Sequence, residues 1–578
     1  MTFDQFSRLV DVRLGLRRPA DAQHLSSFRT VLLYMQWLSE AALILLAGGA
    51  SVVLLYLSLG FLGLTHWLYL AGLAATGLAI MSVALAEATQ FQLLLLRLNQ
   101  REAHGTARWS TSEDLKQANL LALRAPSHPG KIKLGEFGWK HDLVFPIDQM
   151  CCHVAVFGPP QSGKSVSFFV PVLRSWARVG AVFALDTKGE LFKYTARSFR
   201  KVYRLDLENP ALSDRLNLVG ACKGNAEFAH ELAATVVGLD EKAKTAKDPF
   251  WPQAEVALLK SLLMYLAITY ERADIAMART LLAQHSVESL GEMLCWSGDD
   301  AVIESWLFFQ KAKPELQGSI MIGLSTTLEP FASPYARSLF TPPTEEEQAA
   351  GVAEFDLAKL REPGHAAFLV VAEGTAERLH MVMSTIFGAV SAVLRRSGGS
   401  NPTPCLVAVD EAGNFTIPHL AARVGVGRSL GTAYFLGYQG ISQPYARMGH
   451  DAADATFDSI GTMIFLPGLG QKTCEYASRR LGKTTIWSLT SVDAVGSALD
   501  SERLQETGRD LADASSLRQM LKHVEAVMVT STVPPIHFAI PAPALEGNVA
   551  HPQQYDIPDP LGPSGTVVNP QPLFSRLL

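Results

Sequence analysis

The stretch His153-Val-Ala-Val-Phe-Gly-Pro-Pro-Gln-Ser-Gly-Lys-Ser165 decides the fold of this 578-residue chain. Its apolar part, Val154 to Phe157, predicts a short buried strand. The strand leads into GPPQSGKS, Gly158 to Ser165, which fits the P-loop pattern GxxxxGK[ST]. The N–H groups of such a loop point at phosphate oxygens, at the positive end of the following helix. The stretch therefore predicts a nucleotide-binding site.

Two side chains of this loop have predicted chemical roles. Lys164 can reach the β- and γ-phosphates of ATP, and the Ser165 hydroxyl can ligate Mg²⁺. Gly158 and Gly163 permit backbone angles and a close approach that side chains would block. We therefore expect ATP and Mg²⁺ as the cofactors, with Lys164 as a catalytic residue.

The second half of the predicted site lies far along the chain. Cys405 to Val409 predicts a buried strand that ends in Asp410-Glu411. Asp410 would hold Mg²⁺ together with Ser165, and Glu411 would polarise the attacking water. The next predicted strand, Thr432 to Tyr438, ends at Gln439, whose amide can sense the γ-phosphate. The alternative role for Gln439 is that of a polar strand cap.

An α/β pattern surrounds these motifs. The strand Ala181 to Leu185 ends at Asp186-Thr-Lys-Gly-Glu190, and the ends of parallel strands share one ligand-binding edge. Asp186, Lys188 and Glu190 are thus expected near the P-loop; the alternative is a turn with solvated charges. A helix is predicted over 166–176, with a kink at Pro171. The predicted nucleotide-binding residues are Gly158, Pro159, Pro160, Gln161, Ser162, Gly163, Lys164, Ser165 and Asp186. Further strands are expected at 202–205, 366–372, 462–466, 525–530 and 536–540.

The segment 223–318 has a different character. Glycines become rare, and apolar residues recur at helical spacing, as in Trp251, Ala254, Leu258 and Leu262. This pattern predicts an all-helical insertion with its own small core.

The amino-terminal part predicts a membrane anchor. Residues 41–86 contain no Asp, Glu, Lys or Arg, and a spanning helix needs about 20 apolar residues. We place two spans at 41–60 and 67–86; the alternative is a buried helical hairpin. Arginines flank the outer ends of this region and none lies between the spans, so both termini are expected in the cytoplasm.

Composition agrees with a partly membrane-embedded protein and limits its contacts. Hydrophobic residues make up 48% of the chain, and the mean hydropathy is +0.15. The net charge of −5 indicates that any contact with nucleic acid is local. The six cysteines form no CxxC pair and no Cys/His metal spacing, which favours buried thiols in a reducing compartment.

The chain resembles the type IV secretion coupling proteins of the TraG/TraD type, which are DNA-pumping ATPases related to FtsK. The resemblance covers roughly residues 100–540, and the order and spacing of the motifs make it specific. The matching stretches are HGTARW at 104–109, the P-loop, DTKGE at 186–190, DPFWPQAEVALLKSLL at 248–263, SIMIGLSTTLEPFASP at 319–334, VDEAGNF at 409–415, YQGISQ at 438–443 and TCEYASRRLGKTT at 473–485. Gln161 departs from the family pattern, where a glycine or another small residue is common.

This resemblance implies an α/β fold with a RecA-like P-loop core, an inserted all-α domain and a two-helix transmembrane anchor. It implies a homo-hexameric ring in the bacterial inner membrane, with a channel for single-stranded DNA bearing a relaxase, or for protein effectors, and contacts with components of the secretion channel. It also implies an arginine finger, for which Arg428 is the best match and Arg423 the other candidate. The expected parts are 1–40 (cytoplasmic segment), 41–100 (membrane helices and a juxtamembrane helix), 101–222 and 319–550 (the nucleotide-binding domain), 223–318 (the all-α domain) and 551–578 (a flexible tail).

Two alternatives from other classes stay open. One is an FtsK-like motor for double-stranded DNA, although such motors usually carry more spans, a long linker and a terminal winged domain. The other is a membrane scaffold that binds nucleotide without turnover. Intact Lys164, Ser165, Asp410 and Glu411 favour an active ATPase over this scaffold.

Overall fold

The computed structural model describes residues 104–239, 242, 248, 250–397, 402–415, 417, 419–492 and 501–541. Within these residues no helix has both the length and the apolar character needed to cross a bilayer. The predicted spans 41–60 and 67–86 and the predicted tail 551–578 lie outside the described residues. The chain divides into two compact units, and the described part of the larger one comprises 111–477 and 514–541 with the gaps given above.

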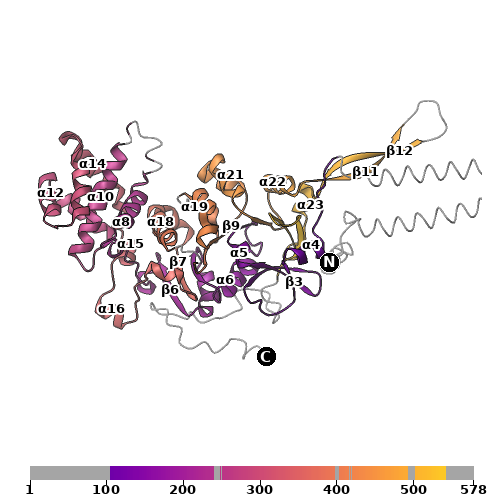
Figure 1. Cartoon of the computed structure of the whole chain (residues 1–578), viewed down its shortest axis with the longest axis horizontal. Coiled ribbons are helices and arrows are strands. Elements are labelled where there is room, and N and C mark those ends of the chain that lie inside the picture. The colour runs from indigo at the N-terminus through magenta and orange to yellow at the C-terminus, as the bar shows by residue number, and fades with distance from the viewer. Residues whose placement is uncertain are drawn as a thin grey trace, which may run out of the picture. The chain divides into compact units, whose positions relative to one another are not determined.

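The larger unit is built on a 12-stranded sheet in the order β1-β3-β2-β14-β13-β10-β4-β9-β8-β5-β7-β6 (Figure 1). Seven neighbouring strands, from β10 to β6, run parallel. Their residues are mostly buried, which is why they read as continuous apolar runs in the sequence. The strands are β4 (Val154–Phe157), β5 (Ala181–Asp186), β6 (Lys201–Asp206), β7 (His365–Val370), β8 (Cys405–Val409), β9 (Thr432–Tyr438) and β10 (Thr462–Phe465).

The other five strands make the sheet mixed. They extend the parallel part through antiparallel pairs, beginning with β10 against β13. The strands predicted at 525–530 and 536–540 are present, but they lie inside the sheet, between β10 and β2, rather than at an edge. The strands are β1 (Leu121–Leu123), β2 (Lys131–Phe137), β3 (His141–Pro146), β13 (Glu525–Thr530) and β14 (Ile536–Ala539).

The helix after the P-loop differs from its prediction. Ser165–Phe169 forms a π-helical turn, and α6 (Val170–Trp176) follows. Pro171 lies in the first turn of α6. Proline has no N–H and its ring crowds the carbonyl four residues earlier, so a wider turn before it relieves both problems. The helix type therefore changes just ahead of Pro171, and the expected kink there stays a prediction.

Further helices pack around the sheet. The longest of them, α18, has eleven buried residues, and eight of these are consecutive, so this helix is buried on all sides along its middle. The helices are α4 (Ser112–Gln117), α5 (Ile147–Met150), α7 (Glu190–Thr195), α17 (Glu373–Arg378), α18 (His380–Arg396), α19 (Leu420–Gly427), α20 (Ser442–Met448), α21 (His450–Asp458), α22 (Gln471–Leu481) and α23 (Ala514–Arg518).

The predicted all-helical insertion is present, and Figure 1 shows its helices gathered in a cluster of their own. Trp306 and Phe309 of α13 are buried in its core, as are Leu258 and Leu262 of the 20-residue helix α10, against which α13 packs. The predicted boundary at residue 318 falls within α14, because the helical run continues to α16. The helices are α8 (Ala226–Val237), α10 (Phe250–Thr269), α11 (Ile275–Gln284), α12 (Val287–Cys295), α13 (Asp300–Gln310), α14 (Pro314–Thr327), α15 (Pro334–Phe340) and α16 (Glu345–Ala349).

The smaller unit contains a two-stranded antiparallel hairpin. β11 (Lys483–Val492) pairs with β12 (Ser501–Asp510), and Thr106 forms a bridge with Thr484. The sequence did not predict this hairpin.

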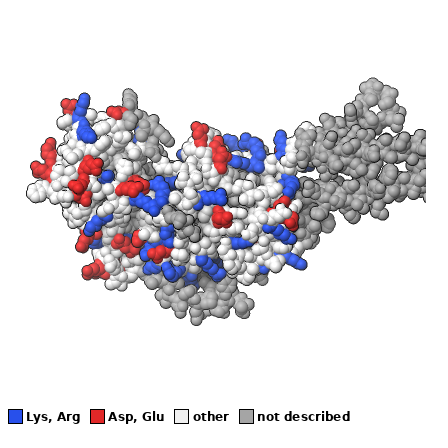
Figure 2. All heavy atoms as spheres, viewed as in Figure 1, with Lys and Arg blue, Asp and Glu red and all other residues white. Residues whose placement is uncertain are grey.

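Charges and thiols complete the description. On the face drawn in Figure 2, Lys and Arg form several small groups rather than one continuous surface, which agrees with a net charge of −5. All six cysteines are free, but Cys295 is exposed and Cys152 half-buried, so the expectation of buried thiols holds only for the other four. The described residues contain no group of three or more His, Cys, Asp and Glu side chains that could hold a metal ion.

Candidate nucleotide-binding site

The P-loop joins β4 to the π-helical turn, and its backbone takes unusual angles. Gln161 and Gly163 have φ values of 59° and 91°, in the left-handed region that favours glycine. A glycine at position 161, which is common in the family, suits this angle, whereas Gln161 carries a strain of about 1 kcal/mol. A Cβ on Gly158 would lie 2.5 Å from Ser162 Oγ and 2.8 Å from Leu466 Cδ1, so glycine is required there by close packing.

Sheet register brings the two predicted halves of the site to one edge. β9 lies between β4 and β8, pairing Tyr438 with Phe157 and Leu436 with Val409. The residues that follow these strand ends, Gly158, Asp410 and Gln439, therefore lie at the same end of the sheet. Gly437 leaves the space that Asp410 occupies, because a Cβ there would be 3.0 Å from Asp410 Oδ1.

Lys164 is buried and contacts the second half of the site. Its Nζ donates to the Gly158 carbonyl at 2.8 Å and lies 3.5 Å from Glu411 Oε1. The Glu411 side chain is 11% exposed, so this ion pair is shielded from water. Lys164 and Glu411, from the two halves of the predicted site, thus lie together at the sheet edge.

Glu411 is held from two sides. Its Oε2 accepts a hydrogen bond from Gln439 Nε2 at 2.9 Å, while Oε1 faces Lys164. Its backbone φ of 63° is rare for a residue with a side chain, and such angles occur often at functional sites. Gln439, predicted as a sensor of the γ-phosphate, therefore contacts the carboxylate predicted to polarise water.

Ser165 and Asp410, which were predicted to hold Mg²⁺, lie in contact with each other. The Ser165 hydroxyl donates to Asp410 Oδ2. Asp410 Oδ1 is buried and has no hydrogen-bond partner among the described residues. Burial raises the pKa of Asp410, while the Ser165 hydroxyl and the Lys164 ammonium partly oppose that rise. A hydroxyl and a carboxylate with an unpaired oxygen suit Mg²⁺, which prefers oxygen ligands, so these residues fit the ion.

Asp186 lies beside Asp410 but uses its oxygens elsewhere. Leu185 pairs with Val409, so the next residues, Asp186 and Asp410, are neighbours at the sheet edge. The Asp186 carboxylate accepts hydrogen bonds from the Phe192 N–H at 2.8 Å and the Lys188 N–H at 3.3 Å. Burial raises the pKa of Asp186 to about 6, and the charge of Asp410 adds to that rise. A nucleotide contact by Asp186 stays a prediction.

The two candidate arginine fingers have different surroundings. Arg428 is exposed, in the 3₁₀ turn Arg428–Leu430 after α19. Arg423, inside α19, is half-buried and donates to the Phe387 carbonyl at 3.1 Å. Neither arginine forms an ion pair with Glu411 or Asp410 within the described residues.

Three residues near this site were missed by sequence analysis. The Gln439 N–H donates to Gln443 Oε1 at 3.0 Å, and Gln443 Nε2 donates to Asn414 Oδ1 at 3.1 Å. His523 lies so close to the P-loop that a Cβ on Gly163 would be 3.2 Å from its Nδ1. Gln443 stood within the quoted YQGISQ stretch and Asn414 within VDEAGNF, which was the available signal, whereas nothing in the sequence singled out His523.

Known proteins of similar sequence confirm the family that the motifs predicted. The profile described as type IV secretory system conjugative DNA transfer matches residues 106–539. The VirD4 protein of Rhizobium rhizogenes is 33% identical over 128 residues, which cover 21% of this chain and 18% of that protein. A conjugal transfer protein TraG of Escherichia coli is 26% identical over 219 residues, which cover 33% of each chain. The chain thus aligns with less than half of the length of these relatives.

Solved structures agree in fold. The unbound conjugative coupling protein TrwB, lacking an amino-terminal segment, superposes with a TM-score of 0.55 at 16% identity, covering 75% of this chain and 92% of that one. TrwB in complex with ADP and Mg²⁺ gives a TM-score of 0.54 at 17% identity, with the same coverage. Because the family profile covers most of the sequence and the fold agrees, the chain belongs to the type IV secretion coupling proteins, the family of VirD4, TraG and TrwB.

Proposed function

We propose that this protein is a membrane-anchored ATPase that couples ATP hydrolysis to transfer of a substrate through a type IV secretion channel. The observation that carries the proposal is the meeting of five side chains from three separate parts of the sequence. Lys164 lies 3.5 Å from Glu411, Gln439 donates to Glu411, and Ser165 donates to Asp410. A P-loop and an acidic pair in this arrangement can bind and hydrolyse a nucleotide.

The proposed mechanism starts from an exchange of partners by Lys164. Its ammonium leaves the Gly158 carbonyl and Glu411 for the β- and γ-phosphates of ATP. Glu411 then keeps the hydrogen bond from Gln439 and accepts a proton from the attacking water. Ser165 and Asp410 would hold Mg²⁺, which neutralises phosphate charge when bound.

We also propose that a neighbouring subunit contributes an arginine to this site. Charge that develops on the transferred phosphoryl group requires a further cation, and a neighbouring subunit can supply an arginine. Arg428 is exposed at the end of α19, whereas Arg423 is directed inward to the Phe387 carbonyl. This contrast favours Arg428 as the finger and a ring, as a homo-hexamer, as the active form.

The proposed substrate is single-stranded DNA bearing a relaxase, or a protein effector. The relatives named for conjugal transfer support this cargo. We place the catalytic domains in the cytoplasm and the predicted spans 41–60 and 67–86 in the bacterial inner membrane, in contact with channel components.

Steady-state ATPase assays of the full chain in lipid nanodiscs test this function. We expect turnover that single-stranded DNA stimulates, that Glu411→Gln removes, and that the exposed control Glu304→Gln leaves unchanged. Stimulation by duplex DNA alone would favour an FtsK-like motor. The absence of turnover in the wild-type protein with every DNA tested would favour a nucleotide-binding scaffold.

Reporter fusions test the proposed topology. Fusions at residues 20 and 120 are expected to report the cytoplasm, and a fusion at Gly63 the periplasm, because arginines flank only the outer ends of the apolar region. A cytoplasmic signal at Gly63 would overturn the two-span anchor.

A further inference from the structure

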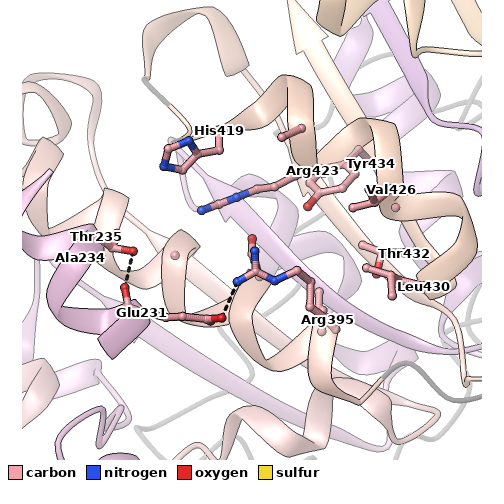
Figure 3. Close-up of a pocket in the computed structure, with 15 residues that line it drawn as sticks. Glu231, Ala234, Thr235, Arg395, His419, Arg423, Val426, Leu430, Thr432 and Tyr434 are labelled. Carbon is pink, nitrogen blue, oxygen red and sulfur yellow. Dashed lines mark hydrogen bonds and ion pairs between the residues drawn. The ribbon is translucent and has the colours of Figure 1, made fainter. Parts of the chain in front are cut away.

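A second cavity lies where the helical cluster meets the sheet. It has a volume of about 410 Å³ and is lined by residues of α8, α18, α19 and β9 (Figure 3). Because α8 opens the helical insertion and β9 is a central strand, this pocket joins the two parts of the larger unit. Proteins bind small molecules in cavities of about 300–1,000 Å³, so its size suits such a ligand.

The pocket is separate from the nucleotide site. Thr432 and Tyr434, at the amino-terminal end of β9, line the pocket, whereas Gln439 follows the other end of the strand. A strand rises about 3.3 Å per residue, so Tyr434 and Gln439 are roughly 16 Å apart. A ligand in this pocket would therefore not occupy the place of ATP.

One cation in the pocket lacks a counter-charge. Arg395 forms an ion pair with Glu231 at 2.9 Å, and Arg396 approaches the same carboxylate at 3.7 Å. Arg423 extends into the middle of the pocket in Figure 3, and in the described part of the chain it takes part in no ion pair. Its guanidinium has five N–H donors and uses one of them on the Phe387 carbonyl.

The surroundings of Arg423 make this lack of a partner costly. Burial lowers the pKa of Arg423 to about 10, which shows that the protein disfavours its charge there. A desolvated cation is stabilised mainly by an opposite charge with hydrogen bonds of good geometry. Glu231 acts on Arg423 only through its nearby charge and forms no ion pair with it, and Glu231 Oε2 has no hydrogen-bond partner among the described residues. The arginine thus presents unused donors to the pocket.

The rest of the lining is mainly apolar. Ala234, Leu394, Ala422, Val426 and Leu430 surround the space, and Val426 is 48% exposed, as expected at an open rim. An apolar wall with a few convergent polar groups is typical of small-molecule sites. The ligand should therefore combine one charged group with an apolar body.

We propose that this pocket binds a small organic monocarboxylate, with its carboxylate on Arg423 and its apolar body against Val426 and Leu430. The planar guanidinium matches a carboxylate through two parallel hydrogen bonds. Glu231 neutralises Arg395, so one positive charge faces the pocket, and a monoanion balances it better than a doubly charged phosphate does. This inference does not depend on the proposed ATPase activity.

Equilibrium dialysis of labelled benzoate against the full chain in phosphatidylcholine nanodiscs tests the proposal. We expect saturable binding of one benzoate per chain at concentrations up to about 10 mM, and much weaker binding of uncharged benzamide. Arg423→Gln should weaken benzoate binding about tenfold or more, because hydrogen bonds to charged groups are the strong ones. Glu231→Gln should have the opposite effect and strengthen binding severalfold, because it leaves Arg395 without its counter-charge.

Two controls locate the site. Arg178→Gln removes an exposed arginine just after α6, and Lys164→Ala removes the lysine of the P-loop; both should bind benzoate as the wild-type protein does. Absence of saturable benzoate binding would overturn the proposal. So would equal binding of benzamide, unchanged binding by Arg423→Gln, weaker binding by Glu231→Gln, or loss of binding in Lys164→Ala.

Discussion

The two ends of strand β9 carry two different kinds of positively charged site. At its carboxyl end, Lys164 contacts both the Gly158 carbonyl and the Glu411 carboxylate, which we propose a phosphate replaces. Near its amino end, Arg423 contacts one carbonyl and forms no ion pair in the described part of the chain. Lys164 thus has an ionic partner within the protein, whereas Arg423 has hydrogen-bond donors left for a ligand.

The two ends also differ in how they are assembled. The phosphate end is made from short contiguous motifs, in which the functional residues follow strand ends directly. The pocket near the amino end of β9 is lined by single side chains from α8, α18, α19 and β9, and these residues form no recognisable sequence motif. Substitutions at the two ends should therefore have separable effects, on catalysis at one and on ligand binding or stability at the other.

The largest expected effect is that of Lys164→Ala at the carboxyl end. Loss of the ammonium removes the cation that binds the phosphates, and loss of one such donor costs about a hundredfold or more in turnover. Arg423→Gln, at the other end of β9, should keep ATP affinity and change turnover less than Lys164→Ala does. Nucleotide binding and ATPase assays on both variants measure this contrast. Equal losses of turnover in the two variants would contradict the view that the two ends of β9 act separately.

Arg428→Ala tests whether a neighbouring subunit completes the carboxyl end. An arginine finger contributes about 10³-fold or more to turnover, so this variant should be nearly inactive on its own. Mixing it with inactive Lys164→Ala protein should restore partial ATPase activity, because some interfaces pair an intact P-loop with an intact arginine. Full activity of assembled Arg428→Ala rings would exclude this residue and leave Arg423 as the candidate.

Gln439→Ala tests whether Gln439 orients the Glu411 carboxylate for catalysis. This change removes the 2.9 Å hydrogen bond that orients the Glu411 carboxylate, while it leaves Lys164 and its contacts with the loop in place. We expect turnover to fall about tenfold to a hundredfold with little change in KM, since orientation of a general base contributes on this scale. A large rise in KM without a fall in kcat would assign Gln439 to binding instead.

His153 gives the smallest expected effect, on stability rather than catalysis. Its Nε2–H donates to the Val424 carbonyl at 2.7 Å, and its Nδ1 accepts from the Tyr434 N–H at 3.2 Å. Burial lowers the pKa of His153 to about 4, whereas an unfolded histidine has a pKa near 6.5. The unfolded chain therefore binds more protons between these values, and stability is lost as the pH falls through this window.

At pH 5 this histidine should cost about 2 kcal/mol of the stability present above pH 6.5. His153→Gln should be less stable than the wild-type protein at pH 7, because it loses the acceptor for Tyr434, and should lose less stability on acidification. Denaturant unfolding followed by tryptophan fluorescence at pH 7 and pH 5 measures both effects. An identical pH dependence in the two proteins would contradict the neutral state of His153.

Sequence analysis predicted the parallel strands well because they are buried on both faces. Val154–Phe157, Cys405–Val409 and Thr432–Tyr438 were predicted with the bounds that the structure has. The hairpin of β11 and β12 was missed, since Ser501–Asp510, SERLQETGRD, carries little apolar alternation. Strands of this kind are specified by pairing with a partner rather than by burial.

Sequence motifs predicted which residues of the candidate site lie at the sheet edge, but not how their side chains contact one another. Residues that follow strand ends were placed together by the topology of a parallel sheet, as for Asp410 and Gln439. The contact between Gln439 and Glu411 was not predicted, because it depends on side-chain direction and on the left-handed backbone of Glu411. His523 comes from the antiparallel extension of the sheet, which no local motif connects to the P-loop.

The central claim is that Glu411 activates water in an ATP site built from Lys164, Ser165 and Asp410. The most direct measurement is a single-turnover assay of Glu411→Gln alongside an equilibrium measurement of ATP affinity. We predict that this variant binds ATP with Mg²⁺ as tightly as the wild-type protein and hydrolyses it at least about a hundredfold more slowly, since only the proton acceptor is lost. Hydrolysis by Glu411→Gln at the wild-type rate would contradict the assignment.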